Sequence, residues 1–319
     1  MSDSFRKYLL QTTGASGFEE LEIIQELWSG YGAITRYRLL EAARATVVVK
    51  CISLEQVGHH PRGWNTSASH LRKVKSYDIE NHWYQEYAYR TTSDCRAPQF
   101  IGSYTEGKNQ WIILQDLDEG YPLRKGALEL EEAKVCLAWL ASFHATFMST
   151  TPKQLWTTGT YWHLGTRLDE WERITHPQLK AKAHAIDQRL NECTYQTIVH
   201  GDAKLANFCF AEDGKSVAAA DFQYVGGGCG MKDVAYFLGS CMSSSECEHY
   251  EAQLLDYYFS ILQQKVDYRL DFNAMETEWR ELYAFAVADF VRFLKGWMPT
   301  HQKINAYSTK ITEEILGVI

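Results

Sequence analysis

One short stretch of the sequence places an acid and an amide at a spacing suited to phosphoryl transfer. It runs Val199-His200-Gly201-Asp202-Ala203-Lys204-Leu205-Ala206-Asn207. A carboxylate such as Asp202 can act as the catalytic base that accepts the proton of an attacking hydroxyl. Asn207 offers a neutral oxygen to Mg²⁺, a hard cation that takes oxygen ligands and keeps several waters. The pair therefore predicts a catalytic loop with a metal ligand at its end.

A second carboxylate follows at the end of a short apolar stretch. Residues 217–220 lead into Asp221-Phe222-Gln223, 19 residues after Asp202. Either motif alone could be a turn or a strand-end cap. In this order and at this spacing they are typical of a kinase catalytic loop followed by a metal-binding strand. We therefore predict an enzyme that uses ATP and Mg²⁺ as cofactors, with Asn207 and Asp221 as the metal ligands.

The elements around these motifs predict an α+β protein with a bilobal, protein-kinase-like fold. The first half is rich in β-branched and apolar runs, which indicates a β-rich N-terminal lobe over residues 1–118. Residues 21–28 could be a strand or the end of a helix, and residues 53–77 look like an irregular insertion. We expect strands at 35–40, 46–51, 100–104 and 110–114, and a helix at 79–90.

The second half predicts a mostly helical C-terminal lobe over residues 119–319, beyond a hinge near 115–122. Apolar residues from Leu130 to Phe147 recur at helical spacing. We expect further helices over 166–190 and from Val234 onward, with short strands and loops over 196–224. Layout alone does not establish a function.

Composition excludes several other classes of protein. The 319 residues are 45% hydrophobic and 23% charged, with a net charge of −8, which disfavours nucleic acid as a partner. The basic run from His59 to Lys75 is expected to be a solvated loop. No apolar run suits a signal peptide or a membrane span, so we expect a cytoplasmic protein with no membrane association. The eight cysteines form no CxxC pair, which favours free thiols over a zinc site or disulfides.

Taken together, the motifs resemble the aminoglycoside phosphotransferase and choline kinase superfamily, and most closely its ecdysteroid-kinase-like branch. Residues 112–117 with Gly120-Tyr121 resemble the hinge strand and linker of that superfamily. Residues 140–145 resemble the helix after the hinge. Asp221-Phe222-Gln223 and residues 233–238 resemble the metal strand and the helix that follows it. The resemblance covers most of the chain and implies a small-molecule kinase.

The resemblance also implies roles for residues of the first lobe. Lys50 matches the strand lysine that grips the α- and β-phosphates of ATP. Glu86 is the expected ion-pair partner of this lysine, with Glu80 as its rival. Gly30 and Gly32 match the turn that covers the phosphates, although a simple hairpin turn explains them equally well.

Further roles are implied for the hinge and the second lobe. The backbone from Gln115 to Leu117 is expected to bind adenine, although Gln115 stands where relatives often carry Glu. Lys204 is expected to stabilise the charge of the transferring phosphoryl group, or else to be a surface lysine. His144 is expected to hydrogen-bond the catalytic loop, and Asp233 to hold backbone amides of a nearby loop.

The acceptor is expected to be a hydroxyl of a small molecule, bound in the helical lobe, and its identity stays open. The sequence has two aromatic groups, one of Trp156, Tyr161, Trp162 and Trp171, the other of Trp279, Tyr283, Phe285, Phe290, Phe293 and Trp297. Aromatic walls suit an amino alcohol such as choline or an apolar, steroid-like alcohol, and core packing explains them too. Aminoglycosides and sugars also remain open. Asp289 is either a counter-charge for a cationic acceptor or the partner of Arg292.

Two other functions stay open on the sequence alone. A protein kinase is disfavoured, because no activation segment is recognisable between Asp221 and Asp233. A catalytically silent nucleotide-binding or scaffold protein of the same fold is the alternative. Four retained residues argue against it: Lys50, Asp202, Asn207 and Asp221.

Overall fold

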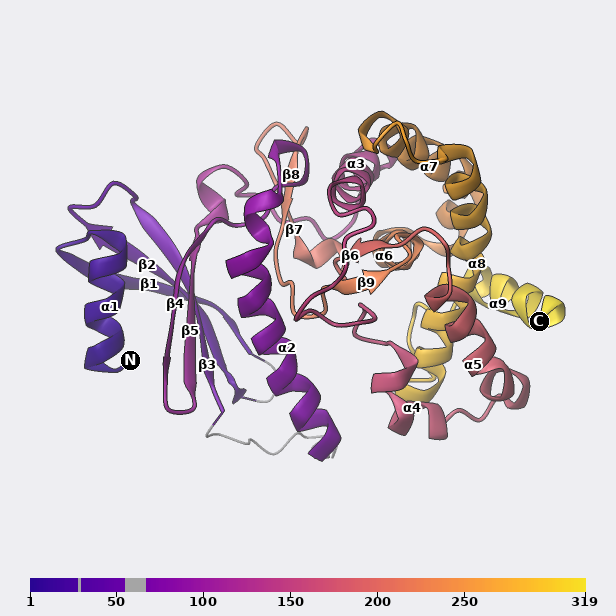
Figure 1. Ribbon diagram of the computed structural model, residues 1–319, viewed down its shortest axis with the longest axis horizontal. Helices are drawn as coiled ribbons and strands as arrows, with labels where there is room; N and C mark the ends of the chain where they lie inside the picture. Colours follow the sequence, from indigo (N-terminus) through magenta and orange to yellow (C-terminus); the bar gives the residue numbers. More distant parts are fainter. Residues whose placement is uncertain (28–29, 55–66) are drawn as a thin grey trace. The chain divides into compact units, whose positions relative to one another are not determined.

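A computed structural model of the chain describes residues 1–27, 30–54 and 67–319 (Figure 1). It divides into two compact units. Unit 1 comprises Met1–Arg90 and Ala97–Gly120, and unit 2 comprises Thr91–Arg96 and Tyr121–Ile319. Unit 1 holds an antiparallel sheet and unit 2 is mostly helical, so the predicted kinase-like α+β fold is confirmed.

Unit 1 is built on one five-stranded antiparallel sheet with the order β1-β2-β3-β5-β4. The ambiguous segment around residues 21–26 is a strand, paired with β2 along its length. The four predicted strands are present and slightly longer than expected. The bounds are β1 Gly17–Glu26, β2 Gly32–Leu40, β3 Thr46–Ser53, β4 Phe100–Glu106 and β5 Asn109–Gln115.

Strand β3 is covered by packing on both of its faces. Its alternate residues Val47 and Val49 join the core cluster with Phe5 and Leu9 of helix α1 (Asp3–Thr13). Lys50 points to the opposite face, because successive side chains of a strand alternate. There it meets helix α2 (Ser67–Glu86), and Figure 1 shows the sheet between α1 and α2.

Helix α2 corrects the expectation of an irregular insertion over residues 53–77. The helix begins at Ser67, so residues 67–77 of that segment are helical, while residues 55–66 lie outside the described part of the chain. Lysine, histidine and serine are common around residues 67–75 and resemble a loop. Further along the same helix, Tyr77 and Trp83 are buried. Because tertiary packing supplies most of a helix's stability, these contacts stabilise the helix in spite of its polar start.

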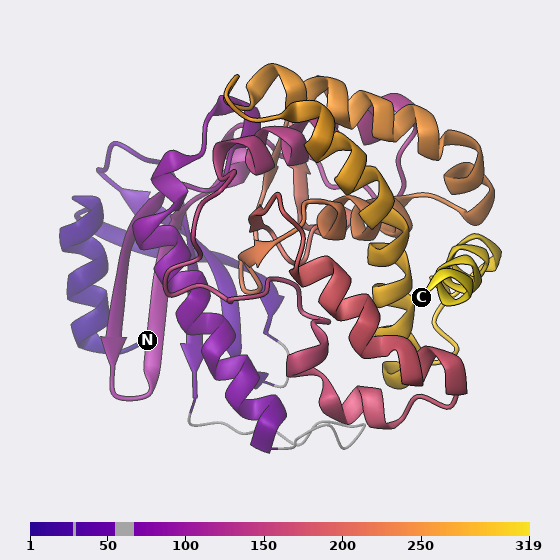
Figure 2. The same cartoon turned by 45° about the vertical axis from the view of Figure 1, so that its right-hand side comes forward.

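Unit 2 is organised around a long helix, α8 (Phe272–Trp297), which packs against α5, α6 and α9 (Figure 2). Helix α3 packs mainly on α7. The segment 166–190 is two helices rather than one. Pro177 begins the second, since proline fits the first turn of a helix but not its interior. The bounds are α3 Leu130–Thr146, α4 Leu168–Glu172, α5 Pro177–Asn191, α6 Met231–Cys241, α7 Ser244–Lys265 and α9 Ala306–Val318.

Two small antiparallel pairs carry the predicted motifs. Strand β6 (Thr197–Val199) pairs with β9 (Gly226–Gly228), and β7 (Phe208–Phe210) pairs with β8 (Val217–Ala219). Close packing explains Gly226 in the glycine run of β9. A Cβ atom on Gly226 would lie 2.2 Å from the carbonyl oxygen of Trp156. Any side chain there would push the two backbones apart.

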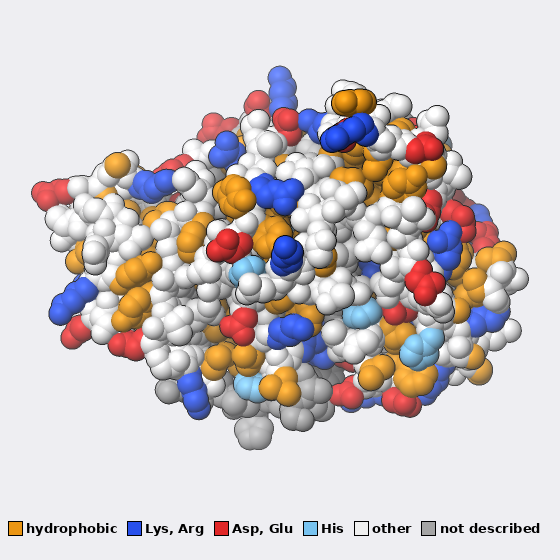
Figure 3. Space-filling model, viewed as in Figure 1, with side chains coloured by type: hydrophobic (Ala, Val, Ile, Leu, Met, Phe, Trp, Pro, Cys, Tyr) orange, Lys and Arg blue, Asp and Glu red, His pale blue; other side chains and the backbone are white. Residues whose placement is uncertain are grey.

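The charged surface and the free cysteines match what the composition of the chain indicated. Basic and acidic side chains of the described residues intermingle over the face shown in Figure 3. No helix in the described part of the chain has both the length and the apolar character needed to cross a membrane. All eight cysteines are free thiols, as expected.

Candidate active site

The catalytic loop of unit 2 holds Asp202 in a defined orientation between β6 and β7. Its Oδ2 atom accepts hydrogen bonds from Lys204 Nζ at 3.0 Å and from Asn207 Nδ2 at 3.3 Å. The Asp202 carbonyl oxygen accepts a second bond from Asn207 Nδ2 at 2.7 Å. The three predicted residues therefore meet around one carboxylate.

The other oxygen of this carboxylate accepts no hydrogen bond from the part of the chain that the structure describes. Asp202 Oδ1 is buried and makes no hydrogen bond with the described residues. The residue as a whole is only 6% exposed, so little solvent reaches this oxygen. Burial raises the pKa of Asp202, Lys204 lowers it, and Asp221 raises it further. A buried acceptor without a partner is costly in a folded protein. Such an atom suits a group that receives a proton from a bound hydroxyl.

His200 fastens the catalytic loop to the segment that leads into Asp221. The Asp202 backbone N–H donates to His200 Nδ1 at 3.2 Å, which places the ring proton on Nε2. His200 Nε2 then donates to the carbonyl oxygen of Ala220 at 3.1 Å. The Ala220 N–H in turn donates to the Asn207 carbonyl oxygen at 3.0 Å. Burial lowers the pKa of His200, so the ring stays neutral in this clamp.

A buried carboxylate on helix α6 supports the loop from behind. Asp233 accepts the backbone N–H of His200 at 2.6 Å and that of Gly201 at 2.9 Å. His144 of helix α3 lies 3.1 Å from Asp233 and 2.8 Å from the hydroxyl of Tyr258. His144 therefore reaches the catalytic loop through Asp233 rather than by a side-chain bond of its own.

The loop also requires a glycine. Gly201 has a φ of 79°, in the left-handed region that disfavours side chains. A Cβ atom there would lie 2.0 Å from the carbonyl oxygen of Tyr224. The glycine before the predicted base is thus set by both backbone conformation and packing.

Asn207 and Asp221 present a donor set that suits Mg²⁺. Asn207 uses its amide nitrogen to bind Asp202, which leaves the amide oxygen as the atom available to a cation. Asp221 adopts a φ of 68°, a sparsely populated conformation for a residue with a side chain. Its Oδ1 atom accepts a hydrogen bond from Gln223 Nε2 at 2.6 Å.

The charges around this donor set also suit a cation. Asp221 is close enough to raise the pKa of Asp202, and a bound cation would relieve that repulsion. Among the described residues, no three His, Cys, Asp or Glu side chains gather as a metal site. A kinase-type magnesium site does not need three, because phosphate and water oxygens complete it.

In unit 1, the strand lysine forms a buried ion pair, but not with the expected residue. Lys50 Nζ lies 2.6 Å from Glu80 Oε2, and their side chains are 4% and 2% exposed. Glu86 is exposed, so its predicted pairing with Lys50 is wrong. The two glutamates are six positions apart, which places them on different faces of helix α2. The rival candidate, Glu80, is the partner.

The remaining predicted residues of unit 1 occupy a turn and the end of the sheet. Gly32 begins β2 with a φ of 133°, and Gly30 precedes it with a φ of 73°. Gln115 ends β5, and its side-chain oxygen accepts the Gln99 N–H at 3.4 Å. Leu117 is buried in the short helical turn that follows. Their contact with a nucleotide stays a prediction.

Part of each predicted aromatic group joins one cluster in unit 2. Tyr161 and Trp162 of the first group pack with Phe290 and Phe293 of the second. Tyr236 of helix α6 joins them, and its ring lies 4.8 Å from that of Trp162. Sequence reasoning missed Tyr236, because it lies in the family-like run 233–238 rather than in an aromatic-rich segment. We call these five residues the aromatic cluster.

This cluster lies close to the candidate base. Burial is the main cause that raises the pKa of Tyr161 and of Tyr236, and the charge of Asp202 is the next for both phenols. Lys303, on the loop between α8 and α9, is also missed by sequence reasoning. Its ammonium lies 4.4 Å from the centre of the Tyr236 ring.

Asp289 is buried and forms an ion pair within helix α8 through one of its two carboxylate oxygens. Arg292 Nε donates to Asp289 Oδ1 at 2.8 Å, and both residues are fully buried. Arg292 also donates to the Trp162 carbonyl oxygen at 2.8 Å. The alternative pairing within helix α8 is therefore the one that forms, and it anchors Trp162.

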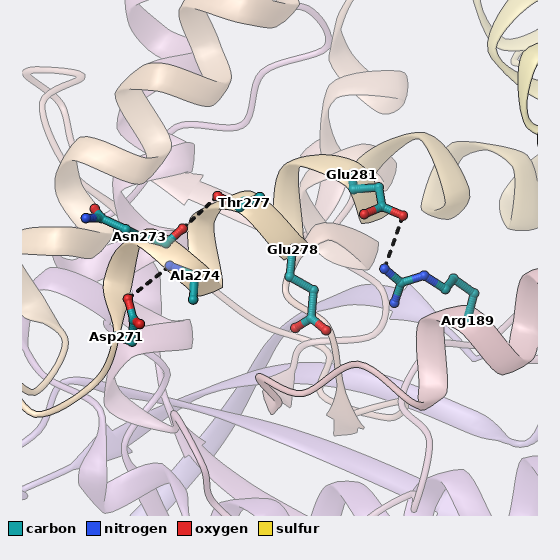
Figure 4. Close-up of a pocket in the computed structure, with 7 residues that line it drawn as sticks. All are labelled: Arg189, Asp271, Asn273, Ala274, Thr277, Glu278 and Glu281. Carbon is teal, nitrogen blue, oxygen red and sulfur yellow. Dashed lines mark hydrogen bonds and ion pairs between the residues drawn. The ribbon is translucent and has the colours of Figure 1, made fainter.

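A shallow hollow in unit 2 is a weaker candidate for a site. Figure 4 shows its polar lining side chains, most of which are engaged with neighbours. Asp271 caps the Ala274 N–H at 3.1 Å, and Glu278 accepts the N–H groups of Thr194 and Tyr195. Glu281 pairs with Arg189 at 3.1 Å. These bonds explain the residues as helix caps and surface ion pairs.

Comparison with known families connects this geometry to phosphotransferases. The model of the ecdysteroid kinase-like family matches residues 162–269. The chain is similar to this family, as its motifs predicted. The matched segment contains Asp202, Asn207 and Asp221. A comparison with curated proteins gave no match.

Solved structures show the same fold at low sequence identity. An amicoumacin kinase in complex with AMP-PNP, Ca²⁺ and Ami is 10% identical, with a TM-score of 0.53 over 99% of this chain and 92% of that one. A microcompartment-associated aminopropanol kinase is 14% identical, with a TM-score of 0.52 over 99% and 95%. The ethanolamine kinase of Plasmodium vivax is 11% identical, with a TM-score of 0.51 over 97% and 84%. The comparisons support a phosphotransferase.

Proposed function

We propose that this chain transfers the γ-phosphoryl group of ATP to a hydroxyl of a small molecule. The observation that carries the proposal is the Asp202 carboxylate. It is buried, held by Lys204 and Asn207, and left with one oxygen that accepts no hydrogen bond within the described residues. A carboxylate in this state is suited to accept a proton from a hydroxyl placed beside it.

In this proposal, each residue of the site in unit 2 has a distinct role in phosphoryl transfer. Asp202 orients the hydroxyl and takes its proton. Lys204 stays protonated, because nearby carboxylates raise its pKa against the effect of burial, and it is suited to stabilise negative charge on the phosphoryl oxygens. Asn207 and Asp221 would hold Mg²⁺, which neutralises charge on the phosphates when bound.

Residues of unit 1 are proposed to hold the nucleotide. Lys50, which pairs with Glu80, would bind the α- and β-phosphates. Gly30 and Gly32 would let backbone amides approach the phosphates. The backbone between Gln115 and Leu117 would bind adenine. Support for these roles comes from the family-like motifs and from the buried ion pair.

The named kinases of similar fold act on small molecules, which supports a small-molecule acceptor. The segment between Asp221 and helix α6 is short, residues 222–230, and includes β9. It therefore offers little chain for the long activation segment of a protein kinase. We propose a cytoplasmic enzyme with no nucleic-acid partner, as the composition indicates.

The test is phosphoryl transfer from [γ-³²P]ATP with MgCl₂ to a panel of hydroxyl compounds. The panel holds choline, ethanolamine, an aminoglycoside, sugars, and steroid or terpenoid alcohols. Transfer to at least one compound is expected, and Asp202→Asn should reduce it by about 10²–10⁴-fold while the fold and nucleotide binding persist. ATP binding without transfer to any compound or to water would favour the silent alternative. Near-normal turnover by Asp202→Asn would remove the assigned base.

A further inference from the structure

Lys303 has a fixed backbone and a part-buried side chain. Its N–H donates to His301 Nδ1 at 3.1 Å, and its carbonyl oxygen accepts the Ser308 hydroxyl at 2.8 Å. These bonds tie the loop between α8 and α9 to the start of α9. The position of the Lys303 side chain is therefore set by a loop whose backbone is fixed by hydrogen bonds.

The Lys303 ammonium lies over aromatic rings rather than beside a carboxylate. Its Nζ atom is 4.4 Å from the centre of the Tyr236 ring and 5.5 Å from that of Phe290. These two rings meet edge to face with centres 4.9 Å apart, so one cation can contact both. Within the described residues, the contacts of Lys303 Nζ are with these rings, and it forms no hydrogen bond or ion pair. The contact is a cation–π interaction, the usual way in which proteins hold a tetraalkylammonium group.

The same ammonium lies within the electrostatic reach of the candidate base. Burial lowers the pKa of Lys303 to about 8, while Asp202 raises it and Lys204 lowers it. Lys303 is therefore mostly protonated near neutral pH. Asp202 and the Lys303 ammonium thus act on each other electrostatically, so a hydroxyl compound held beside Asp202 is also exposed to the charge of Lys303.

We propose that Lys303 is a specificity-determining residue that occupies the cation position of the aromatic cluster and so excludes positively charged acceptors. This inference rests on the proposed function, since it concerns the acceptor of that same reaction. A free ammonium compound would find the faces of Tyr236 and Phe290 covered. It would also meet the like charge of Lys303 close to Asp202. The site accordingly takes an uncharged or anionic hydroxyl compound and rejects amino alcohols.

Charge, and not only size, distinguishes this proposal from simple packing. Choline and 3,3-dimethyl-1-butanol have nearly the same shape and differ in the replacement of N⁺ by carbon. Lys303→Ala removes both the charge and the bulk, and Lys303→Arg keeps the charge. A residue that only fills space would alter the binding of both probes alike. A residue that supplies the cation alters the ratio between them.

The experiment measures binding of both probes by isothermal titration calorimetry to the full chain, without ATP. In the wild type and in Lys303→Arg, choline should bind more weakly than 3,3-dimethyl-1-butanol, or not at all. In Lys303→Ala, choline should become the preferred probe, with its affinity relative to the alcohol rising by roughly tenfold or more. Circular dichroism of each variant verifies the fold, and Lys303→Gln serves in place of Lys303→Ala if the alanine variant is unfolded.

Three results would overturn the inference. Choline could bind the wild type as tightly as Lys303→Ala, or fail to bind any variant. Lys303→Ala could also gain affinity for both probes equally, which would show that only space was opened. Because no phosphoryl transfer is measured, these outcomes are independent of the proposed function. That function fails separately, if no hydroxyl compound is phosphorylated by the wild type.

Discussion

The carboxylate of Asp233 on helix α6 lies 3.1 Å from His144 Nε2 on helix α3, and both side chains are fully buried. The same carboxylate accepts two backbone N–H groups of the catalytic loop. One buried acid therefore joins two helices to the loop that carries Asp202. The position of the candidate base depends on a residue that does not touch any reacting group.

Replacing Asp233 by Asn should destabilise the protein and loosen the loop. One amide oxygen can accept, but the amide nitrogen would face donors that then lose their partner. The expected loss is about 2–4 kcal/mol in the free energy of unfolding, measured by urea denaturation. Asp213→Asn is the control, because Asp213 is exposed and only caps the Lys215 N–H. Similar losses in both variants would contradict the role given to Asp233.

Helix α2 provides a matched pair of glutamates for a second test. Glu80→Ala leaves Lys50 as a buried charge without its carboxylate, which should cost about 3–5 kcal/mol of stability. Glu86→Ala lies on the same helix but is exposed, and its effect should stay within about 0.5 kcal/mol. Glu80→Ala should also weaken ATP binding relative to the wild type, measured under the same conditions for both proteins. Equal effects of the two changes on stability and ATP binding would reject the assignment of Glu80.

The glutamates also show where sequence reasoning succeeds and where it stops. Asp202, Asn207 and Asp221 were found because their spacing along the chain carries the chemistry directly. Choosing between Glu80 and Glu86 required the face of a helix whose start was not recognised. A signal was present, since Tyr77, Glu80 and Tyr84 are three and four residues apart and share one helix face. Tyr77 and Tyr84 are both buried, so Glu80 had to be on the buried side.

Sequence reasoning misses Lys303 for a different reason. Its neighbours Tyr236 and Phe290 come from helices α6 and α8, and they lie 67 and 13 residues before it in the sequence. No periodicity or motif in one sequence connects such residues, because their contact is created only by the packing of helices. The two aromatic groups were recognised as separate sets for the same reason.

The two proposed magnesium ligands should differ in their effect on metal dependence. Asp221→Ala removes a charged ligand, whereas Asn207→Ala removes only a dipole. We expect Asp221→Ala to raise the Mg²⁺ concentration needed for AMP-PNP binding by the larger factor. Thermal shift measurements over a MgCl₂ titration at fixed AMP-PNP test this. An equal Mg²⁺ requirement in the two variants would contradict the ranking.

Lys303→Met should stabilise the protein at neutral pH, and the gain should disappear in alkali. Burial lowers the pKa of Lys303 to about 8, below its value in an unfolded chain, so the folded state disfavours the ammonium. Below pH 8 the lysine is charged in both states and carries the full cost. Between pH 8 and about 10.5 the folded protein loses its proton first, so wild-type stability rises relative to the variant. Since the side chain is part-exposed, we expect a gain of about 1–2 kcal/mol at pH 7.

Urea denaturation at pH 7 and pH 10.5 measures this difference in the free energy of unfolding. Lys310→Met is the control, because Lys310 is exposed and its replacement should show no such gain. A pH-independent difference between wild type and Lys303→Met would show that the buried ammonium is not its cause.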